Sequence, residues 1–175
     1  KEVSLPKDYT PKDLVSIPKE IKTTKFICIK KDMVGSLQKM FEDAQVDNIT
    51  LAVSSGFRSA ERQSILYKAL ILLKGEKAKD RIAEPLHSEH QLGTTIDITG
   101  KSINYLGAND KFNLTVEDLW LRENAYKYGF VLSYPKDKES VTGYDYEPWH
   151  YRFVGVAIAK EIFDGAMSVE EYFIP

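Results

Sequence analysis

Four stretches of the chain carry the apolar spacing or the flanking residues that predict helices. They are residues 31–45, 60–74, 115–129 and 156–166. Ser59 and Thr115 precede two of them as N-caps, and Gly75 and Gly129 stand where the same two helices end. The helix boundaries are therefore predicted by capping residues as well as by the apolar pattern.

Short runs rich in β-branched and apolar residues predict strands between these helices. The runs lie at residues 25–30, 49–57, 94–99, 130–134 and 149–155. The segment SEHQ (88–91) has the form of a capping box and predicts a short helical turn, whereas residues 135–146 read as a polar loop. Because the strands and helices do not alternate as β-α-β units, we expect a single α+β domain with a central antiparallel sheet flanked by helices.

The length of 175 residues fits one compact domain. Pro6, Pro11 and Pro18 lie among charged residues near the start, which predicts that residues 1–24 form an extended arm packed on the domain. Residues 25–175 then form the domain itself. A hydrophobic fraction of 43% and a charged fraction of 29% are ordinary for a soluble globular protein.

The charge of the chain argues against nucleic-acid binding, and its hydropathy argues against a membrane-spanning helix. The net charge is −2 and no basic block occurs, so we expect no nucleic-acid binding. The longest apolar run, KALILLKG, is much shorter than the roughly 20 residues that a membrane helix needs, so we expect no membrane segment. The chain begins at Lys1 rather than at a methionine, which suggests that any signal or anchor is missing from it.

Two of the three histidines lie in polar segments that contain Gly or Pro rather than in apolar runs. His90 lies in SEHQLGTTID, which ends at Asp97, and His150 lies in EPWHYR. Two imidazoles and a carboxylate suit Zn²⁺ as three protein ligands that leave a fourth position for water. Solvated loop histidines are the plainer alternative, and His87 is a competing candidate ligand.

Glu147 stands three residues before His150 and is a candidate general base for zinc-assisted hydrolysis. Residues at i and i+3 point to opposite faces of a regular strand, so these two side chains converge only if the backbone is irregular. Pro148 allows such an irregularity where a strand begins. Gly93 likewise allows the chain to turn within the first histidine segment.

Three separated blocks stand out: SSGFRSAERQ (54–63), SEHQLGTTID (88–97) and EPWHYR (147–152). They resemble the signatures of the VanY-type D-alanyl-D-alanine carboxypeptidases, a zinc peptidase family that includes the LdcB-type L,D-carboxypeptidases. Together they contain the pattern S-x-H-x(6)-D followed by E-x-W-H, and the resemblance covers about residues 45–155. Three blocks in the right order are far more specific than either histidine alone.

The resemblance implies a Hedgehog/DD-peptidase-like fold with one Zn²⁺ as cofactor. It implies that His90, Asp97 and His150 bind the metal and that Glu147 is the catalytic base. Residues 25–175 are then expected to form a zinc carboxypeptidase domain.

The first block implies how a substrate is recognised. Arg58 and Gln63 match positions that face the C-terminal residue of the substrate in this family, and Ser88 matches a serine that binds the same carboxylate. Arg58 is also a candidate catalytic residue, either as a clamp for that carboxylate or as a stabiliser of the developing oxyanion. Phe57 stands where tyrosine is common in the family, which removes one hydroxyl that would face the substrate.

The resemblance implies a carboxypeptidase that removes the C-terminal D-Ala from peptidoglycan stem peptides, with D,D or L,D specificity. An endopeptidase or D,D-dipeptidase on the same scaffold is the first alternative, and a non-catalytic zinc-stabilised cell-wall module is the second. The presence of Glu147 argues against the second, because a structural metal site has no use for a base that is not a ligand. We further expect a monomer that acts outside the cytoplasm, in the cell envelope or after secretion.

Overall fold

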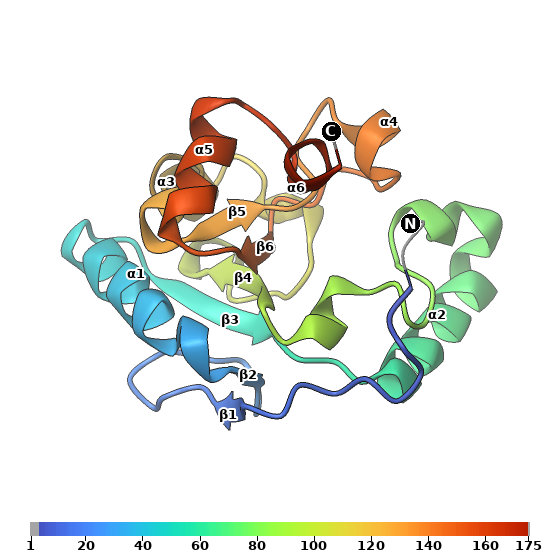
Figure 1. The fold of residues 1–175 in the computed structure, drawn as a ribbon. Coiled ribbons are helices and arrows are strands. Elements are labelled where there is room, and N and C mark those ends of the chain that lie inside the picture. The colour runs from blue at the N-terminus through green and yellow to red at the C-terminus, as the bar shows by residue number, and fades with distance from the viewer. Residues whose placement is uncertain (1–3, 175) are drawn as a thin grey trace.

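The computed structural model describes residues 4–174, and a four-stranded antiparallel sheet runs through its centre (Figure 1). The strand order is β3-β4-β6-β5, formed by β3 (Leu51–Ser55), β4 (Thr95–Gly100), β6 (His150–Phe153) and β5 (Phe130–Leu132). A second, two-stranded antiparallel sheet pairs β1 (Leu14–Ser16) with β2 (Cys28–Lys30). The α+β class and the antiparallel central sheet predicted from the sequence are confirmed.

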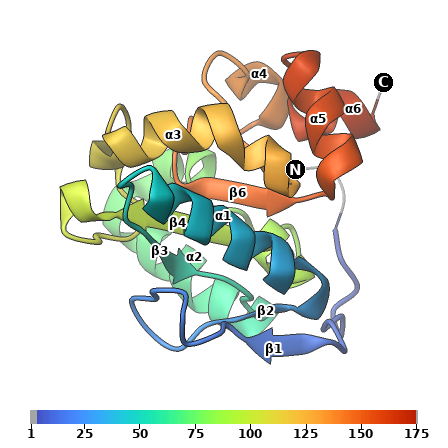
Figure 2. The ribbon, with the colours of Figure 1, turned by 90° about the vertical axis from the view of Figure 1, so that its left-hand side faces the viewer.

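Six α-helices surround the sheets in the described part of the chain. They are α1 (Val34–Val46), α2 (Ala60–Lys74), α3 (Val116–Asn124), α4 (Glu139–Thr142), α5 (Val156–Asp164) and α6 (Val169–Phe173). Short 3₁₀ turns link them: η1 (Lys31–Met33), η2 (Gly75–Asp80), η3 (Glu89–Leu92), η4 (Lys101–Ile103), η5 (Asp110–Phe112) and η6 (Ala125–Tyr128). Figure 1 shows α1 and α2 at opposite ends of the molecule, and in Figure 2 α1 therefore lies in front of α2. No helix within residues 4–174 has the length and apolar character needed to cross a membrane.

Both predicted ends of α2 and the predicted start of α3 agree with the structure, whereas α3 ends at Asn124 and a 3₁₀ turn continues to Tyr128. The Ser59 hydroxyl accepts a hydrogen bond from the Arg62 amide at the start of α2, and Gly75 ends that helix with a φ of 64°. Thr115 caps α3 through the Asp118 amide. Gly129 ends the following 3₁₀ turn with a φ of 86°, a backbone conformation that glycine adopts without strain.

Other local predictions need correction. Ser88 makes no side-chain cap, so the predicted capping box is absent although the turn η3 does form there. The Gln91 side chain donates to the Tyr9 carbonyl instead, and therefore serves a contact between η3 and the N-terminal segment. The predicted loop 135–146 contains the short helix α4, and α6 was not predicted.

The N-terminal segment contains the strand β1, which pairs with β2. Residues 1–3 lie outside the described part of the chain, and β1 is a paired strand within the remainder. The Leu5 amide donates to the Leu86 carbonyl, so the start of the described chain lies against the loop that precedes η3. The assignment of residues 1–24 as a separate arm stays a prediction.

The two faces of the central sheet have different roles. Ile96 and Ile98 of β4 point into the main core, which α1 completes with Leu37 and Met40. Side chains alternate along a strand, so Asp97 points to the opposite face of the sheet. The core thus fixes the strand that carries this carboxylate.

Candidate active site

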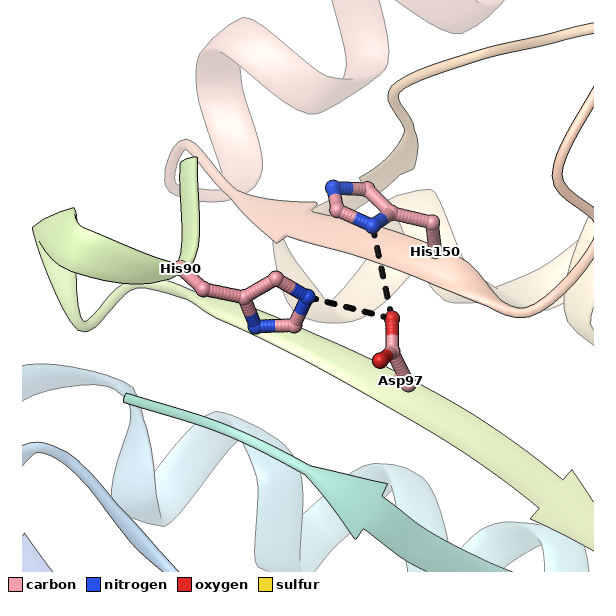
Figure 3. A group of neighbouring side chains, drawn as sticks. All are labelled: His90, Asp97 and His150. Atoms are coloured by element: carbon pink, nitrogen blue, oxygen red, sulfur yellow. Dashed lines mark ion pairs between the residues drawn. The ribbon is translucent and has the colours of Figure 1, made fainter. Parts of the chain in front are cut away.

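Asp97 and His150 are directly opposed across β4 and β6. The register pairs Asp97 with His150 and Ile96 with Tyr151, so the first pair lies together on the face opposite the core. The His150 Nδ1 atom lies 3.3 Å from Asp97 Oδ1. Figure 3 shows this pair beside His90, whose side chain reaches the same oxygen from outside the sheet.

His90 reaches the pair because the chain turns sharply after η3. Gly93 adopts a φ of 75° at the end of this turn, and β4 begins two residues later. His90 Nδ1 donates to the Gly56 carbonyl at 2.8 Å, which leaves the Nε2 lone pair directed at Asp97 Oδ1, 3.3 Å away. Burial lowers the pKa of His90 more than the nearby Asp97 raises it, and this keeps the imidazole neutral.

The three side chains fit a Zn²⁺ ion. One ligand atom from each of His90, Asp97 and His150 lies within 4.8 Å of the others, and all three residues are buried. Asp97 Oδ1 is buried without a hydrogen-bond partner among the described residues, although it faces two imidazole nitrogens. A cation at this point would satisfy that oxygen, and two imidazoles with a carboxylate are donors that zinc accepts. His87 lies outside this group and lines a separate small cavity, so it is not a ligand here.

Glu89 holds the far side of the His150 ring. Its Oε2 atom lies 3.0 Å from His150 Nε2, and Oε1 accepts from Arg152 Nη1 at 2.7 Å. Burial alone would raise the pKa of Glu89, but the hydrogen bond with His150 and the charge of Arg152 outweigh it and lower the pKa to about 2. Glu89 is therefore an ionised carboxylate against the His150 imidazole.

Glu147 reaches the cluster from a turn rather than from a strand. The His150 amide donates to the Glu147 carbonyl, so residues 147–150 form the turn that leads into β6. This turn, which contains Pro148, removes the strand-geometry conflict, and Glu147 Oε2 lies 3.4 Å from His150 Nδ1. Burial raises the pKa of Glu147 to about 7, and the positive charges of Arg81 and Arg58 partly offset that rise. A carboxyl group that exchanges its proton near neutrality suits a general base.

Arg58 is held rigidly beside the cluster. Its Nη1 donates to Gln63 Oε1 at 2.9 Å and its Nη2 to Ser55 Oγ at 3.2 Å, while Nη2 lies 3.8 Å from Asp97 Oδ2. Gln63 is fully buried and its amide nitrogen donates to the Ala83 carbonyl at 2.6 Å. Both ends of this amide are thus engaged, and Gln63 orients Arg58.

One cleft of about 440 Å³ opens beside His90, Asp97 and His150. Every site residue predicted from the sequence lines this cleft: His90, Asp97, His150, Glu147, Arg58, Gln63 and Ser88. Tyr134 and Tyr144 also line the cleft, and burial raises the pKa of both phenols, which keeps them protonated. Tyr146 instead contacts Arg122 and Asn113 and does not line the cleft.

Sequence reasoning missed two contributors to this site. Glu89 lies inside the SEHQ segment, but only the fold shows that its partner is a histidine 61 residues away. The Tyr134 ring lies 4.7 Å from the His150 ring, centroid to centroid. No local signal marks this tyrosine, since it reads as the end of a strand.

Known proteins share both the sequence blocks and the fold. Residues 27–156 match the VanY family, described as D-alanyl-D-alanine carboxypeptidase. YodJ of Bacillus subtilis strain 168 is 43% identical over 177 residues, which cover 99% of this chain and 64% of YodJ. The chain therefore spans slightly less than two thirds of this curated relative.

Two solved structures are similar over nearly the whole chain. The LdcB LD-carboxypeptidase is 42% identical with a TM-score of 0.89, covering 97% of this chain and 81% of that one. The vancomycin-resistance D,D-pentapeptidase VanY in complex with Zn(II) is 30% identical with a TM-score of 0.81, covering 98% of this chain and 94% of that one. The predicted Hedgehog/DD-peptidase-like zinc peptidase fold is thereby confirmed.

Proposed function

The chain belongs to the VanY family of D-alanyl-D-alanine carboxypeptidases, and from this membership we propose that it is a zinc-dependent carboxypeptidase acting on peptidoglycan stem peptides. In this reaction the enzyme removes the C-terminal D-Ala. The observation that carries the proposal is the buried His90, Asp97 and His150 group, which shares one cleft with Glu147 and Arg58. A metal site, a base and a cation for a carboxylate are the three parts that such a hydrolase needs.

His90, Asp97 and His150 hold the zinc in this proposal, through the two imidazole nitrogens and the carboxylate oxygen that face one another. When bound, zinc polarises a carbonyl oxygen and lowers the pKa of water toward about 7. Glu147 accepts the proton of the attacking water and then delivers it to the departing amine. Its burial and raised pKa suit both transfers, because the group must first take up a proton and then release it.

Arg58 binds the C-terminal carboxylate of the peptide, and Ser88 adds a hydroxyl beside it. The Arg58 side chain is only 18% exposed and is fixed by Gln63 and Ser55, so little conformational freedom is lost when a carboxylate binds. A planar guanidinium forms paired hydrogen bonds with a carboxylate, which a point charge does not. Gln63 then acts through Arg58 rather than by touching the substrate.

D,D and L,D specificity are both compatible with this arrangement, since either substrate ends in D-Ala. The family match and the Zn(II)-bound VanY structure favour D,D cleavage, whereas the higher identity and TM-score of LdcB favour L,D cleavage. An endopeptidase or dipeptidase on the same scaffold differs from a carboxypeptidase only in the residues that surround the terminal carboxylate of the substrate. We place the protein outside the cytoplasm, where peptidoglycan stem peptides occur.

The proposal is tested with defined tetrapeptides and pentapeptides that end in D-Ala. Mass spectrometry after incubation with the zinc-loaded protein should show loss of one alanine from at least one of them, and the pattern assigns the specificity. Glu147→Gln protein loaded with zinc is the matched control and should leave both peptides intact. Loss of a dipeptide, or cleavage of peptides with a blocked C-terminus, would instead support the alternative activities.

A further inference from the structure

Glu89 occupies an unusual position for a charged side chain, since only 11% of it is exposed and it lies beside a ligand group. It accepts three hydrogen bonds, two on Oε2 and one on Oε1. Oε2 accepts from Ser133 Oγ at 2.6 Å and lies 3.0 Å from His150 Nε2. Burying a carboxylate is costly unless it is paired in this way.

These contacts join three separate parts of the fold. Glu89 belongs to η3 and immediately precedes His90, Ser133 follows β5, and Arg152 lies two residues beyond His150 on the same face of β6. The Arg152 guanidinium anchors Oε1 at 2.7 Å and thereby leaves Oε2 aimed at the imidazole. Glu89 therefore ties the turn that carries one ligand to the strand that carries another.

The contact also decides which nitrogen of His150 is available. A carboxylate accepts hydrogen bonds and cannot donate them, so Nε2 must carry a hydrogen toward Glu89. Nδ1, which faces Asp97 at 3.3 Å, is then the nitrogen whose lone pair is free for a metal. In His90 the two ring nitrogens have the opposite roles: Nδ1 donates to the Gly56 carbonyl, and Nε2 faces Asp97.

We propose that Glu89 is a positioning residue that fixes the orientation and tautomer of His150 and so strengthens zinc binding. The proposal rests on the proposed function only in its choice of zinc as the metal. Arg152 and Ser133 act through Glu89, one by anchoring Oε1 and the other by adding a donor to Oε2. A simple structural ion pair between Glu89 and Arg152 would leave zinc affinity unaffected, which separates the two interpretations.

Glu89→Gln is the informative variant because it keeps the size of the side chain. With its amide oxygen on Arg152, the amide nitrogen faces His150 Nε2 and favours the tautomer that carries its hydrogen on Nδ1. Loss of such an outer partner typically weakens metal binding about 10- to 100-fold. We expect that loss when zinc affinity is measured by competition with a chelator, in the absence of peptide.

Glu117→Gln provides the matched control. Glu117 is also a buried carboxylate, 2% exposed, but it accepts from the Ser102 amide and lies outside the metal group. This variant makes the same substitution at another buried carboxyl group and should bind zinc as the wild type does. Equal zinc affinity of Glu89→Gln and Glu117→Gln would overturn the proposal.

A measurement on the wild type keeps the test independent of how the variants fold. In ¹⁵N NMR spectra of the zinc-loaded protein, His150 should show a protonated Nε2 whose hydrogen exchanges slowly with water. An unprotonated or zinc-bound Nε2 would contradict the proposal. If zinc binds as expected but no peptide is cleaved, the proposed function falls while the role of Glu89 stands.

Discussion

Arg58 Nη2 lies 3.8 Å from Asp97 Oδ2, while the other oxygen of the same carboxylate lies 3.3 Å from a nitrogen of each of His90 and His150. One buried carboxylate thus contacts the guanidinium on one side and the imidazoles of His90 and His150 on the other. This places the proposed carboxylate-binding group next to the proposed metal. The short distance between the two suits a substrate whose scissile bond is close to its C-terminus.

Replacing Arg58 tests whether it binds the terminal carboxylate. A hydrogen bond to a charged group contributes about 1.5–3 kcal/mol, roughly 10- to 100-fold in affinity. Amidating the C-terminus of a peptide should lower kcat/KM of the wild type by about that factor. It should lower kcat/KM of Arg58→Ala only slightly, because this variant already lacks the guanidinium. Arg58→Lys should recover only part of the activity, since it lacks the planar fork. Equal losses on amidation in wild type and Arg58→Ala would show that Arg58 does not bind the carboxylate.

Glu147→Gln should keep the fold and the zinc but lose activity. Glutamine fills the same space and cannot accept a proton, so we expect kcat to fall by at least about 10²- to 10⁴-fold. Elemental analysis of the purified variant should give the zinc content of the wild type. Near-normal turnover by this variant would assign the base to another group.

His150→Ala should lose the metal. The remaining His90 and Asp97 offer two ligands instead of three, which is too few for a stable zinc site. Elemental analysis should find about one zinc per wild-type chain and little in the variant. His87→Ala is the matched control, because this histidine lies outside the group and its loss should leave the zinc content unchanged. Full zinc occupancy in His150→Ala would refute the ligand assignment.

Gly56→Ala should destabilise the protein and weaken zinc binding together. A Cβ atom here would lie 2.5 Å from Ile27 Cγ2 and 2.7 Å from the Cys28 carbonyl oxygen, so the backbone must shift, at a cost of about 1–3 kcal/mol. The shift would move the Gly56 carbonyl that orients His90. A Cβ atom at Gly35 in α1 would have no neighbour within 4 Å. Gly35→Ala should therefore stabilise the protein by up to about 1 kcal/mol. Thermal unfolding and chelator competition on both variants check this.

The stability of the protein should depend on the ionisation of Tyr128 at high pH. Its hydroxyl donates to Asp43 Oδ2 at 2.8 Å, and burial, with the hydrogen bond to Asp43, raises the pKa of Tyr128 from 10.0 to about 12. Because the pKa is raised on folding, the stabilisation is complete below pH 10 and is lost as the pH rises toward 12. Tyr128→Phe should lower the free energy of unfolding by about 0.5–1.5 kcal/mol at neutral pH. That difference should shrink above pH 10 in denaturant titrations, and a constant difference would contradict the assignment.

The sequence determined the elements and the candidate residues, because both depend on short-range pattern. The ends of α2 were predicted from Ser59 and Gly75, whose effects on the backbone act within one helical turn. His90, Asp97, Glu147 and His150 were candidates from two short polar segments, and the resemblance to the VanY family singled them out. What the blocks could not show is how Glu147 and His150 converge, since a regular strand would separate them and only the turn before β6 brings them together.

Only the tertiary structure decided the arrangement around these residues. Asp97 faces His150 because Ile96 and Tyr151 are paired with their side chains on the core face, and a shift of one residue in register would turn Asp97 into the core. The contact of Glu89 with His150, across 61 residues of sequence, follows from the same register together with the position of η3. Such long-range contacts are set by the packing of the apolar face of the sheet against α1. Side chains from distant segments of the chain form this packing together.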